Sequence, residues 1–212
     1  MTVHIPPAEQ ITFDDVMPTL RTALADDPAL RWVYPDDEAY ERAFPELLLL
    51  ASRGAFDAGT VDVVAEGAEG AEGAEGAGVA GVAIWSPPGS DVDPEEINAQ
   101  WGAHYQQHVD PARLGDIFAW GERFGHFHPT EPHWYLGMLG VAPGEQGRGH
   151  GSALLRAGLE RCDRDGLPAY LESGEPRNRA LYERHGFEVI GEVQIADSPS
   201  VWPMFRRPGG GR

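Results

Sequence analysis

A glycine-rich stretch between two patterned segments constrains the fold of this chain more than any other feature. Residues 134–141 predict a strand, and residues 152–165 predict a helix whose leucines recur at helical spacing. Between them, glycines occupy positions 147, 149 and 151. The first N–H groups of a helix have no intrahelical acceptor, and glycines let a ligand approach the backbone closely. Because the helix dipole adds partial positive charge, the stretch predicts a phosphate site, with Arg148 as a charged donor.

The spacing of these glycines excludes two common phosphate-binding motifs. They alternate as G-x-G-x-G, which differs from the dinucleotide fingerprint G-x-G-x-x-G, and no G-K-[ST] follows them. A pyrophosphate belonging to another kind of cofactor therefore fits better. The alternative interpretation is a tight strand–helix turn that binds no ligand.

The rest of the chain has the element order of one mixed α/β unit. Caps, prolines and apolar spacing predict further helices over residues 12–25 and 37–55, from 93, from 110, and over 176–185. Apolar runs bounded by glycine or proline predict further strands over residues 60–65, 79–85, 169–172, 187–193 and 201–206. No domain boundary is visible, so residues 1–212 are expected to form a single domain.

The charge balance limits the partners of the chain. The net charge is -18, and every one of the 16 basic residues is arginine. Phosphate backbones require basic patches, so nucleic acid is excluded as a partner. An acidic cleft would instead attract cationic small molecules, and the alternative interpretation of the charge is a well-solvated surface. The absence of lysine is typical of a GC-rich bacterial genome.

No segment of the sequence predicts export or membrane insertion. The chain has no apolar run of the roughly 18 residues that span a bilayer, and its start lacks a charged segment followed by an apolar one. A cytoplasmic protein without membrane contact is therefore expected. The single cysteine, Cys162, is expected to be a small apolar residue on a helix.

Two segments carry the signature of a known family. Residues 146–151 fit the pattern [QR]-x-x-G-x-[GA], and residues 178–187 fit N-x-x-x-Y-E-x-x-G-F. In these motifs and their order, the chain resembles the GNAT N-acetyltransferase superfamily. The resemblance implies an α/β (α+β) fold with a mixed, mostly antiparallel sheet of about 6–7 strands flanked by helices. It also implies that two splayed strands form a cleft for acetyl-coenzyme A.

Further segments resemble the puromycin N-acetyltransferases within that superfamily: residues 83–87, 131–136, 171–173, 176–178 and 202–204. This resemblance implies an acyltransferase that moves an acetyl group from acetyl-coenzyme A to an amine of a small molecule, with antibiotics and aminonucleosides among the candidates. The resemblance to this superfamily implies a monomer or a homodimer.

The resemblance does not extend over two segments. Residues 66–77 repeat Glu-Gly-Ala, which buries too little apolar surface to order itself and predicts a flexible hairpin loop. Residues 93–128 are a helical insert, expected near the acceptor site.

The resemblance also implies roles for individual residues. Backbone groups around Leu139, Gly140 and Val141 would pair with the pantetheine arm and polarise the thioester carbonyl. Asn178 would hydrogen-bond the cofactor near its thiol end, and Tyr182 would protonate the leaving thiolate. The pyrophosphate would lie on the turn formed by Gln146, Gly147, Arg148, Gly149, His150, Gly151 and Ser152.

Two side chains are the candidates for proton transfer. The acceptor amine must lose a proton, and Glu172, at the end of a predicted strand, is the best candidate base, directly or through water. The alternative for Glu172 is a salt-bridge or loop carboxylate. Tyr182 lies one helical turn after Asn178, so the two share a face, and its alternative is a core aromatic.

Aromatic residues are expected to line an acceptor site suited to a cation or a flat ring. The candidates are Trp32, Tyr34, Trp85, Trp101 and Tyr105. The alternative for all five is core packing. Acetyl transfer needs no metal, and His126, His128 and His133 lack a convincing set of partner ligands, so no metal site is expected.

Two other functions remain open. Acetylation of a protein N-terminus or lysine requires an open groove, whereas the helices over residues 93–128 suggest a covered site. A sensor module would hold acetyl-coenzyme A without reacting it. Retention of both Asn178 and Tyr182 argues against the sensor.

Overall fold

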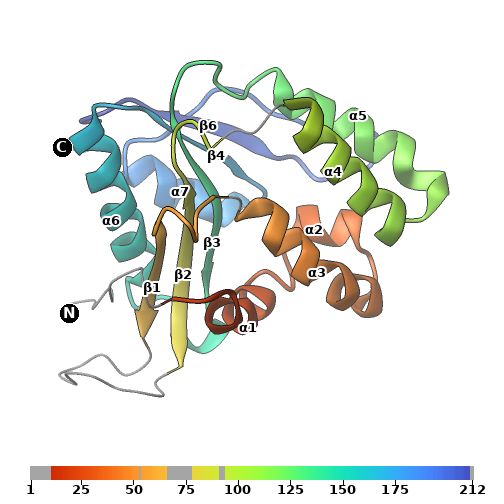
Figure 1. Cartoon of the computed structure of the whole chain (residues 1–212), viewed down its shortest axis with the longest axis horizontal. Coiled ribbons are helices and arrows are strands. Elements are labelled where there is room, and N and C mark those ends of the chain that lie inside the picture. The colour runs from red at the N-terminus through yellow and green to blue at the C-terminus, as the bar shows by residue number, and fades with distance from the viewer. Residues whose placement is uncertain (1–10, 53, 66–77, 91–93, 211–212) are drawn as a thin grey trace.

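The architecture is a six-stranded sheet flanked by seven α-helices, in a computed structural model that describes residues 11–52, 54–65, 78–90 and 94–210 (Figure 1). The helices are α1 (Phe13–Ala23), α2 (Pro28–Val33), α3 (Asp37–Ala51), α4 (Pro94–His108), α5 (Leu114–Gly125), α6 (His150–Asp165) and α7 (Pro176–Arg184). The strands are β1 (Val61–Ala65), β2 (Val79–Ser86), β3 (Trp134–Val141), β4 (Ala169–Ser173), β5 (Glu188–Val189) and β6 (Trp202–Arg206). The mixed, mostly antiparallel α/β fold predicted from the sequence is confirmed.

The strand order is β1-β2-β3-β4-β6-β5, and only β3 and β4 run parallel to each other. Their ladder contains two pairs, Trp134 with Ala169 and Tyr135 with Tyr170. Beyond these pairs β3 stays on β2 and β4 stays on β6, so the sheet opens between β3 and β4. The predicted splay is therefore present.

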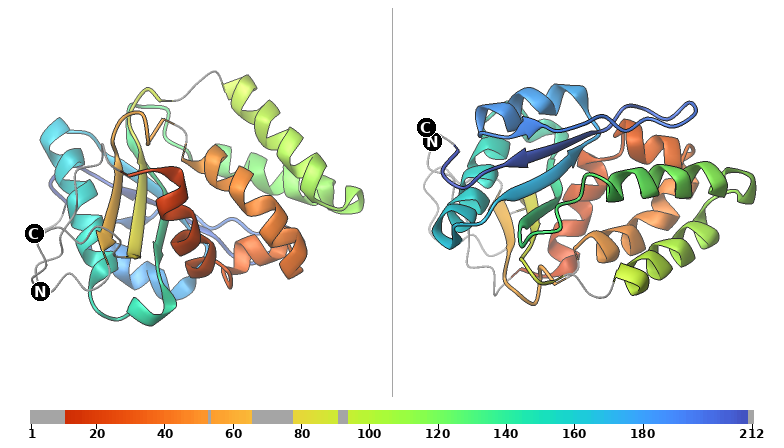
Figure 2. Two further views of the ribbon diagram at one scale, coloured as in Figure 1. Left: turned by 60° about the horizontal axis from the view of Figure 1, so that its bottom comes forward. Right: turned by 90° about the horizontal axis from the view of Figure 1, so that it is seen from above.

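Two apolar cores cover the two faces of the sheet, because strand residues alternate between faces. Val61 and Val63 of β1 pack with α1, α2, α3 and α5. Val64 faces the other way and packs with α6 and with Tyr182 of α7. Helices α3, α4 and α5 lie together beyond the end of the sheet, away from α6 (Figure 2).

Helix starts follow local capping chemistry. Thr12 precedes α1, and the Asp15 carboxylate accepts hydrogen bonds from the N–H and hydroxyl of Thr12, at 2.9 and 2.6 Å. Asp27 caps α2 by accepting from the N–H groups of Ala29 and Leu30.

Several predicted bounds need correction. The sequence analysis missed α2, which has only six residues and too little length to show a helical period. It placed the end of α3 at residue 55, whereas the helix ends at Ala51. It began α6 at residue 152, two residues after the helix starts. The strand expected over 187–193 shortens to Glu188–Val189, followed by an isolated bridge from Val193 to Val201.

The repeat at residues 66–77 and the predicted cap at Asp93 lie outside the described residues. Among the helices of the described part of the chain, none combines the length and apolarity required to cross a bilayer.

Candidate active site

The opening between β3 and β4 leaves one edge of β3 without a strand partner from Leu136 onward, among the residues that the structure describes. A bulge at Gly137 marks where the opening begins, because Trp85 of β2 pairs with Leu136 and Ile84 pairs with Met138. The extra residue also reverses the alternation of β3, so that Leu136 and Met138 pack into opposite cores. An extended ligand arm could therefore pair with the backbone of Leu139, Gly140 and Val141.

The glycine-rich turn follows β3 directly. Gly147 and Gly149 have φ angles of +77° and +87°, a left-handed conformation that favours glycine, and Gly149 is the N-cap of α6. A Cβ atom at either position would meet no atom within 4 Å, so space lies beside the backbone there. The 16-residue helix α6 begins at this turn. Its first N–H groups and the positive end of its dipole therefore lie beside that space.

The side chains of this turn are mostly engaged with one another. Gln146 donates to the carbonyl oxygen of Val141 at 3.2 Å, and Arg148 donates to Glu145 at 2.9 Å. His150 is buried, with Nε2 3.4 Å from a Glu145 oxygen. Ser152 is hydrogen-bonded to His185 of the α7 C-cap at 3.0 Å. In this arrangement the backbone amides are what the turn offers to an anion, because the Arg148 guanidinium is paired with Glu145.

Asn178 and Tyr182 lie on one side of α7, as their spacing predicts. Asn178 is exposed in the first turn, whereas Tyr182 is buried against Phe187, with ring centroids 6.0 Å apart. Burial, and secondarily the nearby charge of Asp27, raises the pKa of the Tyr182 phenol well above its usual value. The phenol is therefore protonated at neutral pH, as a proton donor must be.

Glu172 lies on the opposite face of the sheet from Tyr182. It follows Tyr170 by two residues on β4, and its carboxylate accepts hydrogen bonds from the hydroxyls of Tyr135 and Tyr170, each at 3.0 Å. Burial raises the pKa of this carboxyl, and the two phenols oppose that shift by stabilising the charged form. The carboxyl is thus a proton acceptor whose affinity for a proton exceeds that of an exposed glutamate.

The aromatic candidates separate into two groups. Trp101 stacks on Tyr105, His104 lies edge-on to both, and Tyr34 is hydrogen-bonded to His104 at 2.6 Å. Burial, and secondarily the nearby Glu172 carboxylate, raises the pKa of Tyr105. Trp32 belongs to the same core but packs on Trp120 of α5.

Trp85 packs as its alternative interpretation, core packing, expects. Its ring is fully buried between the sheet and α6, where a Cβ on Gly158 would overlap the indole. Trp85 alternates with Ile84 on β2 and therefore faces the core on the α6 side. Trp85 is therefore part of the core on the side of the sheet opposite Glu172.

The sequence analysis did not identify three side chains that lie beside the candidate catalytic residues. Tyr135 and Tyr170 flank Glu172, and Asp27 lies near Tyr182. The alternation of Tyr170 and Glu172 on one strand was a usable signal, since both side chains must lie on one face. The approach of Tyr135 and Asp27 depends on strand register and helix packing, which the sequence does not show.

The histidines considered in the sequence are brought together only in part. His128 and His133 are 3.2 Å apart between their Nε2 atoms, and His133 Nδ1 lies 2.8 Å from the carbonyl oxygen of Glu131. His126 is exposed at the C-cap of α5. Among the described residues these three do not form a set of metal ligands.

Comparisons with known proteins agree with this geometry. Residues 85–187, just under half of the chain, match the sequence model described as "Acetyltransferase (GNAT) family". An uncharacterized N-acetyltransferase of Schizosaccharomyces pombe is 37% identical over 78 residues, which are 35% of this chain and 32% of that protein. The chain spans between about a quarter and a third of the length of the curated relatives it matches.

Solved structures match over nearly the whole chain. One, described as histone acetyltransferase HPA2 and related acetyltransferase from Corynebacterium glutamicum, is 26% identical with a TM-score of 0.68, covering 99% of this chain and 98% of that one. Arylalkylamine N-acetyltransferase 2 from Aedes aegypti shares the fold, with a TM-score of 0.65, 12% identity, and coverage of 98% and 99%. Together the comparisons support the GNAT acetyltransferase superfamily and indicate an acyltransferase.

Proposed function

We propose that this chain, an acyltransferase of the GNAT type, transfers an acetyl group from acetyl-coenzyme A to an amine of a small molecule. The observation that carries the proposal is the opening of the sheet beyond Tyr135, with the glycine-rich turn at one end of β3 and Glu172 on β4. Tyr182 and Glu172 face opposite sides of the sheet, and the opening connects those sides. A thioester lying in the opening would meet an acceptor from one side and a proton donor from the other.

In the proposed reaction, the neutral amine nitrogen attacks the thioester carbonyl carbon, and a tetrahedral intermediate forms. An N–H on the free edge of β3 stabilises the oxyanion. The C–S bond then breaks, and Tyr182 donates its phenolic proton to the thiolate. Glu172 accepts the proton that the amine loses, directly or through water. Gln146–Ser152 hold the pyrophosphate, and Asn178 bonds the cofactor near its thiol end.

Among acceptors, we propose cationic or flat amines, with antibiotics and aminonucleosides such as puromycin first. The support is twofold: partial likeness of several segments to puromycin N-acetyltransferases, and the stacked rings of Trp101 and Tyr105, of which Tyr105 lies near the Glu172 carboxylate. Aromatic faces attract cations and stack on flat rings. The chain itself is proposed to act in the cytoplasm as a monomer or a homodimer.

A second candidate is acetylation of a protein or peptide amine. It is favoured by the Corynebacterium glutamicum structure, whose description includes a histone acetyltransferase. Helices α3, α4 and α5, which lie together on the Glu172 side, favour a small acceptor instead. Binding of acetyl-coenzyme A without turnover would identify the third candidate, a sensor.

The test is release of coenzyme A thiol from the acetyl form across an amine panel that includes puromycin, other amine antibiotics and lysine-bearing peptides. We expect at least one small amine to raise release about tenfold or more above background hydrolysis, with peptides inactive.

Tyr182→Phe should lower turnover at least about tenfold with little change in cofactor binding, because it removes only the hydroxyl that donates the proton. Activity with peptides alone would favour the second candidate, and unchanged turnover of Tyr182→Phe would remove Tyr182 from its role.

A further inference from the structure

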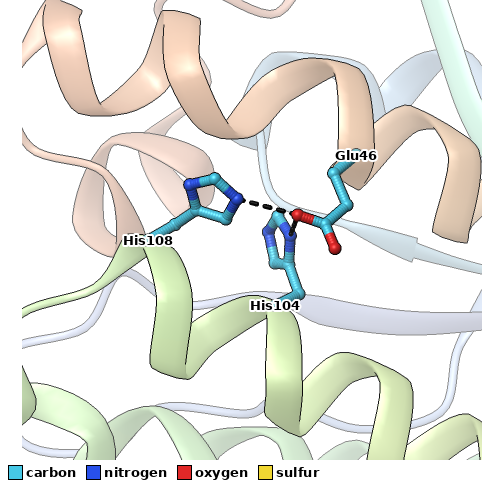
Figure 3. Close-up of side chains that lie close together, drawn as sticks. All are labelled: Glu46, His104 and His108. Atoms are coloured by element: carbon cyan, nitrogen blue, oxygen red, sulfur yellow. Dashed lines mark hydrogen bonds and ion pairs between the residues drawn. The ribbon is translucent and has the colours of Figure 1, made fainter.

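Two histidines and a glutamate converge between helices α3 and α4, outside the residues assigned to acetyl transfer. His104 and His108 are four residues apart on α4 and so point to the same side, toward Glu46 of α3 (Figure 3). The His-x-x-x-His spacing was visible in the sequence, but nothing there showed that Glu46 would face it.

The three side chains present one ligand atom each to a common point. Glu46 Oε2 lies 3.3 Å from His104 Nδ1 and 2.8 Å from His108 Nε2. All three ligand atoms lie within 4.8 Å of one another. Ligands bound to one Zn²⁺ at about 2.0–2.2 Å in a tetrahedral site are roughly 3.3 Å apart. The cluster therefore needs only small side-chain movements to enclose an ion.

His104 is the decisive member of the cluster. Its ring is fully buried, and its Nε2 atom is fixed by the Tyr34 hydroxyl at 2.6 Å. Its Nδ1 atom is buried and has no hydrogen bond of acceptable geometry, although it faces the Glu46 carboxylate. An imidazole held through one nitrogen with the other nitrogen unsatisfied is the arrangement in which an outer partner orients a metal ligand.

We propose that Glu46, His104 and His108 form a binding site for a divalent transition-metal ion of the Zn²⁺ class. Two imidazole nitrogens and one carboxylate oxygen are donors that such ions prefer over Mg²⁺ or Ca²⁺. Three protein ligands leave a fourth position for water. The Glu46 side chain is 42% exposed and supplies the entry path.

The proposed ion ties α4 to α3. It also fixes His104 and, through it, Tyr34, which lies on the acceptor side of the sheet. The ion takes no part in breaking or forming bonds during acetyl transfer. The site and the proposed acetyl transfer can therefore succeed or fail independently.

The first experiment measures binding of Co²⁺ and Zn²⁺ to the untagged, chelator-treated full chain by calorimetry and by the visible absorption of Co²⁺. We expect one ion per chain. Glu46→Gln and His108→Ala should each weaken binding at least about tenfold, since each removes one of three ligands. His126→Ala, which removes an exposed histidine from the same helical region, is the matched control and should bind like the wild type.

Thermal unfolding gives a second readout. Zn²⁺ at about 100 times its Kd should raise the Tm of the wild type and of His126→Ala by roughly 5–10 °C and leave that of Glu46→Gln nearly unchanged. X-ray absorption at the Zn edge of the wild type should count two imidazoles, a measurement that does not depend on any variant folding. Absence of stoichiometric binding, equal binding by Glu46→Gln, or a different imidazole count would overturn the site and leave the cluster as a hydrogen-bonded contact between helices.

Discussion

At the scale of single residues, the protonation state of Glu172 should make the proposed activity depend on pH. Burial raises the pKa of its carboxyl, whereas the hydroxyls of Tyr135 and Tyr170 favour the carboxylate. A base works only when deprotonated, so kcat/KM should fall as pH decreases through this raised pKa. Tyr135→Phe removes one donor to the carboxylate, and the acid limb of the profile should therefore move to higher pH.

The control for that shift is Tyr40→Phe. Tyr40 is also buried, and its hydroxyl donates to the backbone of Arg21, outside the active site. The variant loses the same atom and should keep the wild-type acid limb. An acid limb that stays at the same pH in Tyr135→Phe would mean that another group sets it, and Glu172 would lose its assignment as the base.

At the scale of elements, the turn between β3 and α6 makes a prediction about cofactor binding. Gly149 has a φ of +87°, so Gly149→Val forces a β-branched residue into a conformation that costs about 1–3 kcal/mol. The turn should change shape, and the valine would occupy space beside the backbone amides. Calorimetry should show binding of coenzyme A weakened at least about tenfold.

Gly144→Val is the matched control in the same turn. Gly144 lies in a short 3-10 segment, a Cβ there would meet nothing within 4 Å, and its φ is not in the left-handed region. We expect this variant to bind coenzyme A like the wild type. Wild-type affinity in Gly149→Val would show that the turn does not hold the pyrophosphate.

Elements with strong local signals could be predicted from the sequence, and those decided by packing could not. The strand at residues 134–141 has the predicted bounds, because an apolar run between Pro132 and Pro143 defines it locally. The six-residue α2 was missed despite an Asp27 cap and a proline at its first turn. β5 is shorter than its apolar pattern suggests, and beyond its end the Phe127 ring, from another part of the chain, lies against the backbone of Gly191.

The candidate site shows the same division. The motif at residues 146–151 could be located by spacing alone, since its chemistry is carried by consecutive backbone amides. Tyr170 shares a strand face with Glu172, whereas the approach of Tyr135 depends on the register of β3 against β4. Glu46 meets two histidines more than 50 residues away, and only helix packing brings them together. For Trp85 the sequence left both core packing and an acceptor site open, because residue type does not show which face of a strand a side chain occupies.

At the scale of the whole molecule, an ion pair between buried Arg206 and partly exposed Asp163 joins α6, β6 and the segment near the C-terminus. Arg206 is 2% exposed and donates two hydrogen bonds to Asp163, at 2.7 and 2.9 Å, while the N–H of Gly209 donates to the same carboxylate. Arg206 lowers the pKa of Asp163. The pair therefore stabilises the fold above the pKa that Asp163 has when unfolded, and this contribution is lost as pH falls through the lowered pKa.

Asp163→Asn should reduce the free energy of unfolding at pH 7 by about 1–3 kcal/mol, because the Arg206 charge stays buried while partial exposure of Asp163 screens the loss. Urea unfolding at pH 7 and near pH 3 measures this free energy, and the difference from wild type should shrink at the lower pH.

Since the chain carries a net charge of -18, removing any acid also relieves repulsion. Glu160→Gln, exposed on the same helix, isolates that effect and should not destabilise the fold. Equal stability of Asp163→Asn and Glu160→Gln at pH 7 would mean that Arg206 is held by packing, and that the ion pair does not stabilise the contact between α6 and β6.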